Sequence, residues 1–399
     1  MTDAGFLTRV VIRNYKSIAA CGVRLQPLTF LVGPNGAGKS NFLDAIGFVA
    51  DALRTSLDHA LRERGGIGEV RRRSGGHPTH FGIRLEFTLP DGLAGSYAFR
   101  IGAKPNGAFE VQNEECILHP AEALASEIRF AVAAGELTSA VPGPAAASDR
   151  LYLATASGME EFRPAYYALS RMAFYNLNPE RMKDLQLPDA GELLARDGSN
   201  ISAVLDRIGK RSPEVKAGIE AYLSKVAPGI CGVDAAAIGP RETLQFRQEA
   251  ADAESPWRFF AANMSDGTLR ALGALVALFQ SGDAPLVGID EIEAGLHPAA
   301  VAVLLEALVE ASAARQVLAA SHSPGLLDSP GVGAGSILAV IAEMGSTYAG
   351  PLDSVGRETL RKRLSTGGEI GCLRPDREPL PDVSSQQLDL IAEDRDEPG

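Results

Sequence analysis

The stretch Phe30–Ser40, FLVGPNGAGKS, decides the fold. A β-rich run over Leu28–Val32 leads into G-x-x-x-x-G-K-S, and apolar residues recur at helical spacing through Asn41–Leu53. A strand, a glycine-rich loop and a helix in this order predict a phosphate-binding loop, because backbone N–H groups and the positive end of the helix then face the anion. An ordinary glycine-rich turn is the alternative, and it leaves the strand and the helix on either side unexplained.

The residue types of this loop predict ATP and Mg²⁺ as its ligands. Glycines keep Cβ atoms away from the β-phosphate, Lys39 reaches the β- and γ-phosphates as a catalytic residue, and the Ser40 hydroxyl ligates Mg²⁺. The predicted cofactor-binding residues of the loop are Gly33, Pro34, Asn35, Gly36, Ala37, Gly38, Lys39, Ser40 and Asn41.

A second apolar run, Leu286–Glu291 (LVGIDE), ends in two acids. Strands often end in Asp or Glu at a turn, so this run has weight only beside the phosphate-binding loop. In that pairing we expect Asp290 to hold the water shell of Mg²⁺ and Glu291 to orient and deprotonate the attacking water.

A third run, Val317–Pro324 (VLAASHSP), ends in Ser321 and His322. A neutral imidazole at the carboxyl end of a strand is able to sense a γ-phosphate or to hold the attacking water. The alternative is a histidine that is hydrogen-bonded within its own loop, and the two preceding motifs favour the catalytic interpretation.

The segment Asn263–Arg270 (NMSDGTLR) stands at the head of a predicted helix over Asp266–Gln280. Ser265, Asp266 and Gly267 suit a helix cap, and a serine with exposed N–H groups at a helix start also suits an anion site. The segment follows the loop by about 225 residues. Sequence alone leaves both interpretations open.

In this order the four motifs resemble those of the ABC-type ATPase heads of SMC, RecF and OLD-family proteins, which are grouped with AAA-family ATPases. The start RVVIRNYKSI…LTFLVGPNGAGKSNFLDAI is similar to the family's first strands and Walker A motif. SDGTLR resembles the signature motif, DEIEAGLHP the Walker B motif with its D-loop, and SHSP the His switch. The resemblance covers about residues 1–90 and 255–345, with weaker likeness at Phe174–Glu180 and Asp197–Leu205.

The resemblance implies an α/β fold: a P-loop NTPase with an ABC-type (RecF/SMC-like) head, a mixed sheet, an antiparallel β subdomain and a helical insertion. It also implies an ATP-dependent homodimer, in which Ser265 and Gly267 of one protomer act on the nucleotide that the other protomer holds. Ser17 and its neighbours would lie near the adenine or ribose. The family's Q-loop is not placed, and Gln186 is a poor candidate for it.

Several features depart from the family pattern. Ile292 replaces the usual proline after the acid pair, and no coiled coil separates the two halves, which disfavours a chromosome-tethering machine. About 75 residues follow His322, so we expect a stand-alone head without the TOPRIM nuclease of OLD proteins. The acids of Glu393–Asp396 follow no strand and are not interpreted as a nuclease site.

The expected organisation has four parts. Residues 1–103 form the N-terminal half of the head, with the Walker A motif and a β subdomain that includes strands over Ile83–Thr88 and Tyr97–Ile101. Residues 104–254 form an inserted lobe, residues 255–345 the C-terminal half, and residues 346–399 an extension whose acidic tail is expected to be disordered.

Composition narrows the choice of partners. The net charge is −12, and the last 25 residues carry eight acidic and two basic side chains, so bulk charge does not favour nucleic acid. A local basic stretch, Arg71–Arg73, is either a DNA contact or a solvated loop that Glu63 and Glu69 partly neutralise. No apolar run approaches the roughly 20 residues of a membrane span, and the four scattered cysteines indicate reduced thiols, so we expect a cytoplasmic protein. His77 and His80 are interpreted as part of a surface loop, not as a metal site.

These observations favour an ATP-hydrolysing head that dimerises around ATP and gates action on DNA or on a separate effector or nuclease protein, in DNA repair or phage defence. The alternative is a nucleotide-dependent scaffold or regulatory protein with negligible turnover and no DNA contact. A transporter ATPase subunit is disfavoured because its signature motif follows the P-loop at a much shorter distance than the about 225 residues found here.

Overall fold

The computed structural model describes residues 6–73, 78–121, 126–139, 143–249, 255–280, 282–322, 332–361 and 373–376. The chain forms two compact units. The first comprises Met1–Met172, Ala334–Leu364 and Ile370–Gly399, and the second comprises Ala173–Gly333 and Ser365–Glu369. Most of the acidic tail, including Glu393–Asp396, lies outside the described residues, and so does His77.

The first unit is built on a mixed sheet. Its strands, in spatial order, are β8 (Glu136–Ser139), β7 (Ile128–Ala133), β6 (Phe109–His119), β5 (Ala94–Ala103), β4 (His80–Thr88), β1 (Leu7–Tyr15), β2 (Ile18–Arg24), β16 (Ser346–Pro351), β15 (Ile337–Glu343) and β3 (Leu28–Val32). Neighbours from β8 to β2 are antiparallel, as are β15 and β16, whereas β3 runs parallel to β15 and β16 parallel to β2. The antiparallel β subdomain expected from the sequence is therefore continuous with the strand that carries the phosphate-binding loop.

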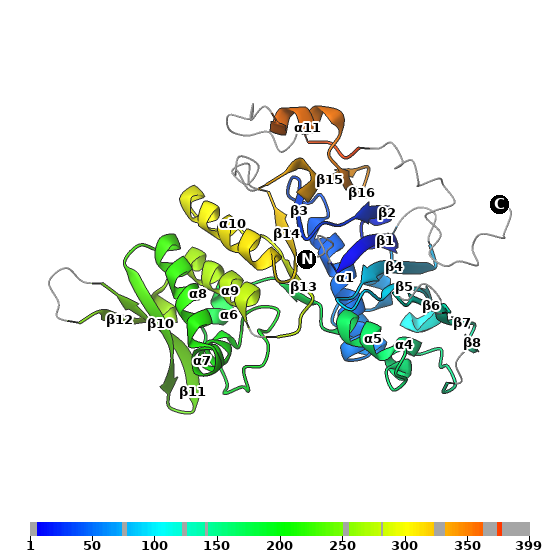
Figure 1. The fold of residues 1–399 in the computed structure, drawn as a ribbon, viewed down its shortest axis with the longest axis horizontal. Helices are drawn as coiled ribbons and strands as arrows, with labels where there is room; N and C mark the ends of the chain where they lie inside the picture. The colour runs from blue at the N-terminus through cyan, green and yellow to red at the C-terminus, as the bar shows by residue number, and fades with distance from the viewer. Residues whose placement is uncertain are drawn as a thin grey trace. The chain divides into compact units, whose positions relative to one another are not determined.

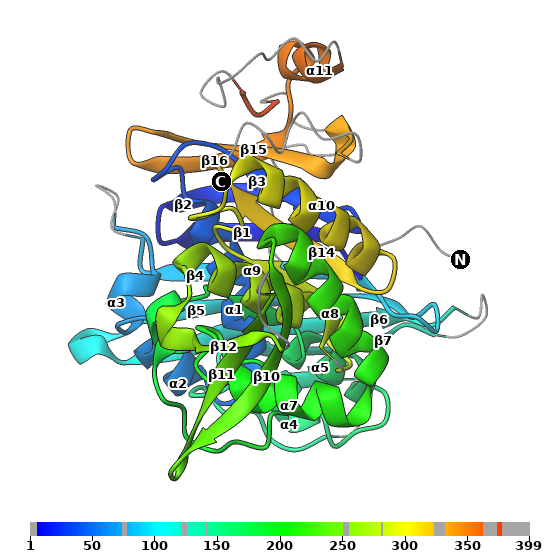
Figure 2. The same ribbon diagram turned by 90° about the vertical axis from the view of Figure 1, so that its left-hand side faces the viewer.

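The β15–β16 hairpin separates two strands that are neighbours in the sequence. β2 and β3 do not pair with each other, because the hairpin lies between them, as Figure 2 shows. The expected boundary at residue 345/346 falls in the turn of this hairpin, and the expected boundary at 103/104 divides β5 from β6, which pair from Ala94↔His119 to Ala103↔Phe109. Strand pairing thus places the C-terminal hairpin and β6–β8 in the same unit as the Walker A motif.

Helix α1 (Lys39–Arg54) covers β1, β4 and β5 (Figure 1). Its Phe48 ring lies 6.1 Å from Tyr15, 5.4 Å from Phe81 and 6.2 Å from Phe99, between ring centroids. These four rings form the apolar core beneath the helix, and they fix it on the sheet. The remaining helices of the unit are α2 (Leu57–Arg62), α3 (Ile67–Val70), η1 (Pro105–Gly107), α4 (Tyr152–Ala156), α5 (Arg163–Ser170), η4 (Ala334–Ser336) and α11 (Ser354–Arg361).

The second unit contains a parallel group of strands in the order β14 (Gln316–Ser321), β13 (Leu286–Ile289) and β9 (Ala173–Tyr175). A separate antiparallel sheet has the order β10 (Ile230–Ile238), β11 (Arg241–Gln248) and β12 (Trp257–Phe260). Its helices, over the described residues, are α6 (Pro179–Lys183), α7 (Ile201–Arg211), α8 (Pro213–Val226), η2 (Ala261–Asn263), α9 (Asp266–Phe279) and α10 (Pro298–Ser312). Parallel strands with covering helices, beside antiparallel sheets, confirm the α/β class. Over the ranges that the structure describes, none of the helices combines the length and the apolar character that crossing a bilayer requires.

Candidate nucleotide site

The phosphate-binding loop occupies residues 33–38, between the end of β3 and the start of α1. Gly36 (φ 76°) and Gly38 (φ 101°) adopt left-handed backbone conformations that favour glycine. The Lys39 side chain is folded into the loop, where its Nζ donates hydrogen bonds to the carbonyl oxygens of Gly33 (2.8 Å) and Pro34 (3.0 Å). The loop therefore curls around the lysine amine.

The first turn of α1 suits an anion. Gly38 occupies the N-cap position, and no side chain caps this end of the 16-residue helix in the described part of the chain. The backbone N–H groups of a helix start and the helix dipole then favour a negatively charged ligand. Lys39 is 7% exposed, whereas Ser40 is exposed beside it. The residues present therefore fit a phosphate group with its Mg²⁺.

Two glycines of the loop also lie directly against the β15–β16 hairpin. A Cβ atom on Gly33 would come within 1.9 Å of the Val340 carbonyl oxygen, and a Cβ atom on Gly38 within 2.0 Å of Thr347 Oγ1. Both distances are far below van der Waals contact. Both ends of the loop thus require glycine because they pack against the hairpin, and glycine there also leaves room for a phosphate to approach.

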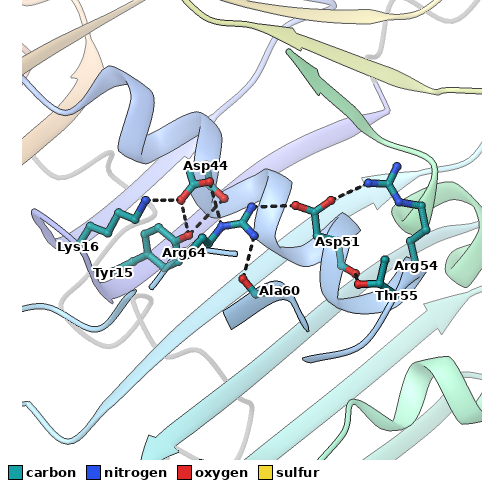
Figure 3. A network of polar contacts seen from close by, with 8 residues as sticks. All are labelled: Tyr15, Lys16, Asp44, Asp51, Arg54, Thr55, Ala60 and Arg64. Carbon is teal, nitrogen blue, oxygen red and sulfur yellow. Dashed lines mark hydrogen bonds and ion pairs between the residues drawn. The ribbon is translucent and has the colours of Figure 1, made fainter. Parts of the chain in front are cut away.

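A buried ionic cluster, drawn in Figure 3, holds α1 in place. Asp44 accepts hydrogen bonds from Tyr15 Oη (2.7 Å) and Arg64 Nε (2.9 Å), and its Oδ2 lies 2.6 Å from Lys16 Nζ. Arg64 also donates to Asp51 Oδ2 at 2.9 Å. Burial by itself would raise the pKa of Asp44, but the charges of Arg64 and Lys16 lower it to about 2. The cluster joins the helix after the loop to the end of β1 and to the segment after α2.

The basic stretch Arg71–Arg73 is largely engaged within the protein. Arg71 donates to the Pro78 carbonyl oxygen (2.8 Å), and Arg72 donates to Ser17 O (2.6 Å) and Ser346 Oγ (2.8 Å). Arg73 pairs with Glu69 on the surface. Arg72 therefore supports the turn between β1 and β2, and contact between this stretch and DNA stays a prediction.

In the second unit, Asp290 and Glu291 follow β13, as expected. The Asp290 N–H donates to Tyr175 O at 2.9 Å, and the exposed Glu291 has a left-handed backbone (φ 50°). Ile292 is buried, and its N–H donates to Ala320 O of the neighbouring strand at 3.4 Å. Proline has no N–H, so isoleucine at this position adds a contact that the usual family residue cannot make.

His322 lies at the end of the adjacent strand and contacts Glu293, which sequence reasoning had missed. Its backbone N–H donates to Glu293 Oε1, and its Nδ1 lies 3.1 Å from the same oxygen. The Glu293 side chain is 5% exposed, against 41% for His322. The two contacts of Glu293 Oε1, with the backbone N–H and with the ring of His322, restrain the orientation of the imidazole. The only sequence signal for Glu293 is its place just after the acid pair.

The signature segment forms a capped helix start. Ser265 Oγ accepts from the Thr268 N–H (3.2 Å) at the head of α9, and Asp266 pairs with Lys183 at 2.6 Å. A Cβ atom on Gly267 would meet the Gly295 carbonyl oxygen at 2.3 Å. The capping interpretation is confirmed, and the close approach packs the helix start against the D-loop segment. An anion-binding role for Ser265 and Gly267 stays a prediction.

Gln186 is a buried structural residue. Its Oε1 accepts from the Ser202 N–H (2.9 Å) at the start of α7, and its backbone exchanges hydrogen bonds with Glu242. Only 4% of the residue is exposed, so it is not placed to reach a nucleotide. Among the described residues, no group of three or more His, Cys, Asp or Glu side chains is arranged to hold a metal ion by itself.

Comparison with known proteins supplies the family. The family described as "AAA domain, putative AbiEii toxin, Type IV TA system" matches residues 28–120 and 134–328, well over half of the chain. The chain belongs to this AAA-domain family. Its fold is that of an ABC-type, SMC/RecF-like ATPase head, as the resemblance in the sequence implied.

Curated relatives match over short segments. The DNA replication and repair protein RecF of Magnetococcus marinus is 37% identical over 110 residues, which is 26% of this chain and 26% of that protein. Structural maintenance of chromosomes protein 1 of Schizosaccharomyces pombe is 32% identical over 123 residues, which is 29% of this chain and 10% of that protein. The chain thus spans about a quarter or less of the length of these relatives.

Solved structures agree over most of the chain. The Smc head domain of Pyrococcus furiosus bound to the C-terminal domain of ScpA gives a TM-score of 0.56 at 12% identity, and covers 90% of this chain and 99% of that one. An SMC head bound to the C-winged helix domain of ScpA gives 0.54 at 15% identity, and covers 86% and 96%. At this level of identity, the likeness shows that this AAA-domain chain has the same fold as the SMC heads.

The first prediction concerns the buried cluster. Asp44→Asn removes the buried carboxylate shared by Arg64 and Lys16 and leaves Arg64 paired with Asp51 alone, and we expect it to lower the free energy of unfolding by about 3 kcal/mol at pH 7. Because the pKa of Asp44 falls from 3.8 to about 2 on folding, its contribution is complete at neutral pH and is lost as the pH falls through 4 toward 2. Denaturant unfolding at pH 7 and pH 3.5 should therefore show a smaller difference at the lower pH. Asp58→Asn, in an exposed pair with Arg62, should change stability by less than about 1 kcal/mol at both.

The second prediction concerns the signature glycine. Gly267→Ala places a methyl group against the backbone of Gly295, and we expect a loss of about 1–3 kcal/mol by thermal or denaturant unfolding. Gly218→Ala, within α8, meets no atom within 4 Å and should stabilise the protein by about 0.5–1 kcal/mol. Equal effects of the two substitutions would contradict the packing role assigned to Gly267.

Proposed function

We propose that the chain is an ATP-dependent head that binds ATP with Mg²⁺, hydrolyses the ATP and dimerises around it. The observation that carries the proposal is the loop of residues 33–38, which curls around Lys39 and ends in the uncapped start of α1. Membership of the AAA-domain family supports the same conclusion. The output of nucleotide binding would be a change in how the dimer acts on DNA or on a partner protein.

Each site residue has a separate role in this proposal. Lys39 moves from the carbonyl oxygens of its own loop to the β- and γ-phosphates, which offer it full negative charge. Ser40, through its hydroxyl, and Asp290, through the water shell, would hold Mg²⁺. When bound, the ion neutralises charge on the phosphates. Glu291 orients the attacking water and accepts its proton, and His322, oriented by Glu293, holds that water or senses the γ-phosphate.

Dimerisation would place the signature segment of one protomer on the nucleotide of the other. Ser265 and Asp266 are exposed at the start of α9, where a helix dipole favours an anion. The ion pair from Lys183 offsets the charge of Asp266, which would otherwise repel phosphate. The Thr268 hydroxyl is hydrogen-bonded to the Ser265 hydroxyl, and this bond stabilises the first turn of α9 in the absence of ligand.

Two classes of target are compatible with such a head. RecF is named as a DNA replication and repair protein, and the compared SMC heads are bound to domains of ScpA, a separate protein. In this chain, Arg71 and Arg72 already donate to carbonyl oxygens of the protein, which leaves fewer of their N–H groups for DNA phosphates. A protein effector therefore has the stronger support.

Lys39→Ala tests nucleotide binding. We expect the Kd for ATP, measured by calorimetry with Mg²⁺, to rise by about tenfold to a hundredfold, since charge-assisted hydrogen bonds to phosphate are lost. Lys104→Ala removes a lysine that pairs with Glu110 on the surface of the same unit, and it should bind as the parent does. A Lys39→Ala variant with the parent's affinity would remove the basis of the proposal.

Glu291→Gln separates hydrolysis from mere binding. The variant keeps the shape of the side chain and loses the base, so ATP should bind with the parent's affinity while phosphate release falls by at least about a hundredfold. A dimer trapped by ATP should then appear in light scattering after size exclusion. Glu306→Gln, at an exposed position of α10, is the matched control. If the parent itself releases no phosphate above the Glu291→Gln background, the alternative of a nucleotide-dependent scaffold with negligible turnover is favoured.

A further inference from the structure

Thr347, in strand β16, is buried beside the phosphate-binding loop. It is 2% exposed, and its hydroxyl donates to the Ala37 carbonyl oxygen at 2.9 Å. Its Oγ1 also lies 2.7 Å from Ser17 Oγ, and the Thr347 N–H donates to Ser17 O at 2.9 Å. Asn41 Nδ2 completes the set by donating to Ser17 Oγ at 2.7 Å. We refer to Ser17, Ala37, Asn41 and Thr347 as the loop clamp.

The hydrogens in the loop clamp have one consistent arrangement. Thr347 has a single hydroxyl hydrogen, which goes to Ala37 O, so Thr347 must accept the hydrogen of Ser17. Ser17 in turn accepts from Asn41. The bonds therefore run in one direction, from the Asn41 amide through the two hydroxyls to the Ala37 carbonyl, and such chains strengthen their members.

Both ends of this chain lie in the phosphate-binding motif. Ala37 and Asn41 flank Gly38, Lys39 and Ser40, and the two hydroxyls from β16 and from the β1–β2 turn join these flanks. Gly38 lies against the same threonine, with no space for a Cβ atom. The clamp consequently fixes the bend at which the loop becomes helix α1.

We propose that Thr347 is a positioning residue for the nucleotide: its hydroxyl sets the curvature of residues 37–41, so that the N–H groups of this segment converge on phosphate. The inference rests on the proposed function, because it assigns the segment to ATP. The Thr347 side chain acts through Ala37 and Ser17 and does not touch the ligand.

Thr347→Val keeps the shape of the side chain and removes the hydroxyl, whereas Thr347→Ser keeps the hydroxyl. With Val, Ala37 O loses its donor and the Ser17 hydroxyl loses its acceptor, so we expect the Kd for ATP to rise by about tenfold or more. With Ser, the Kd should stay within about threefold of the parent. KM should rise with Val while kcat changes little. Thr347→Ala is a second variant without the hydroxyl and without branching, and it should behave as Val does.

A readout without nucleotide accompanies these measurements. Hydrogen exchange of the backbone amides in residues 36–42 should be faster in Thr347→Val and Thr347→Ala than in Thr347→Ser or the parent. Ser346→Ala is the control: it removes the neighbouring hydroxyl, which bonds to Arg72 and not to a clamp residue. Arg72 keeps its hydrogen bond to Ser17 O, so both the exchange and the Kd should stay unchanged.

The outcomes separate the two proposals. If the parent binds ATP and the Thr347→Val and Thr347→Ala variants bind it equally well, the role of Thr347 is overturned and the proposed function stays intact. If Thr347→Ser also binds ATP weakly, the loss of affinity is due to side-chain packing and not to the hydroxyl, and the role of the hydroxyl is overturned. A parent that binds no ATP overturns the proposed function, and the nucleotide role of Thr347 with it, even where the exchange data show the clamp.

Discussion

The close approach of the phosphate-binding loop to the β15–β16 hairpin is the constraint on which the rest of the first unit depends. Neither Gly33 nor Gly38 has room for a Cβ atom, because Val340 O and Thr347 Oγ1 occupy that space. The two contacts hold the loop at its ends and leave the exposed residues between them facing outward. A loop that is fixed in this way loses little conformational freedom when an anion binds, and preorganised sites bind more tightly for that reason.

The charged side chains of the first unit have two kinds of partner within the protein. Asp44 and Arg64 are buried and paired, so they position α1 and offer nothing to a ligand. Lys39, by contrast, bonds to neutral carbonyl oxygens of its own loop, a weaker partner for an ammonium than phosphate. Arg72, like Arg64, is bonded within the protein, because its guanidinium donates to backbone and hydroxyl oxygens. The role of each charged side chain thus depends on the partners that it bonds to.

The sequence predicted those parts of the fold in which chemistry and periodicity coincide. The strands over Leu28–Val32 and Leu286–Ile289 have the predicted bounds, and the helix predicted over Asn41–Leu53 extends over Lys39–Arg54. Strand β6 was missed because it buries Glu114, which accepts hydrogen bonds from Tyr97 and from the start of α4. A buried acid of this kind breaks the alternation by which a strand is identified in sequence.

The candidate site shows the same division. Local motifs predicted where the acids and His322 follow their strands. The partners that orient these groups, such as Glu293 and Thr347, carry no motif of their own. The turn Met344–Gly345 has positive φ at both residues, as a two-residue hairpin requires, but methionine in the first position gives no sequence signal for it. Partners far along the chain are visible only once the sheet order is known.

That sheet order has a consequence for how nucleotide binding relates to folding. Thr347 bonds to Ser17, which lies 330 positions earlier in the sequence, so the loop clamp forms only when the C-terminal hairpin has docked between β2 and β3. Residues 1–172 alone contain the motif, yet they lack the strand that supports it. A ligand that binds only the docked form stabilises that form by mass action. Nucleotide in the loop would therefore stabilise the whole first unit, including the β15–β16 hairpin that lies against the loop.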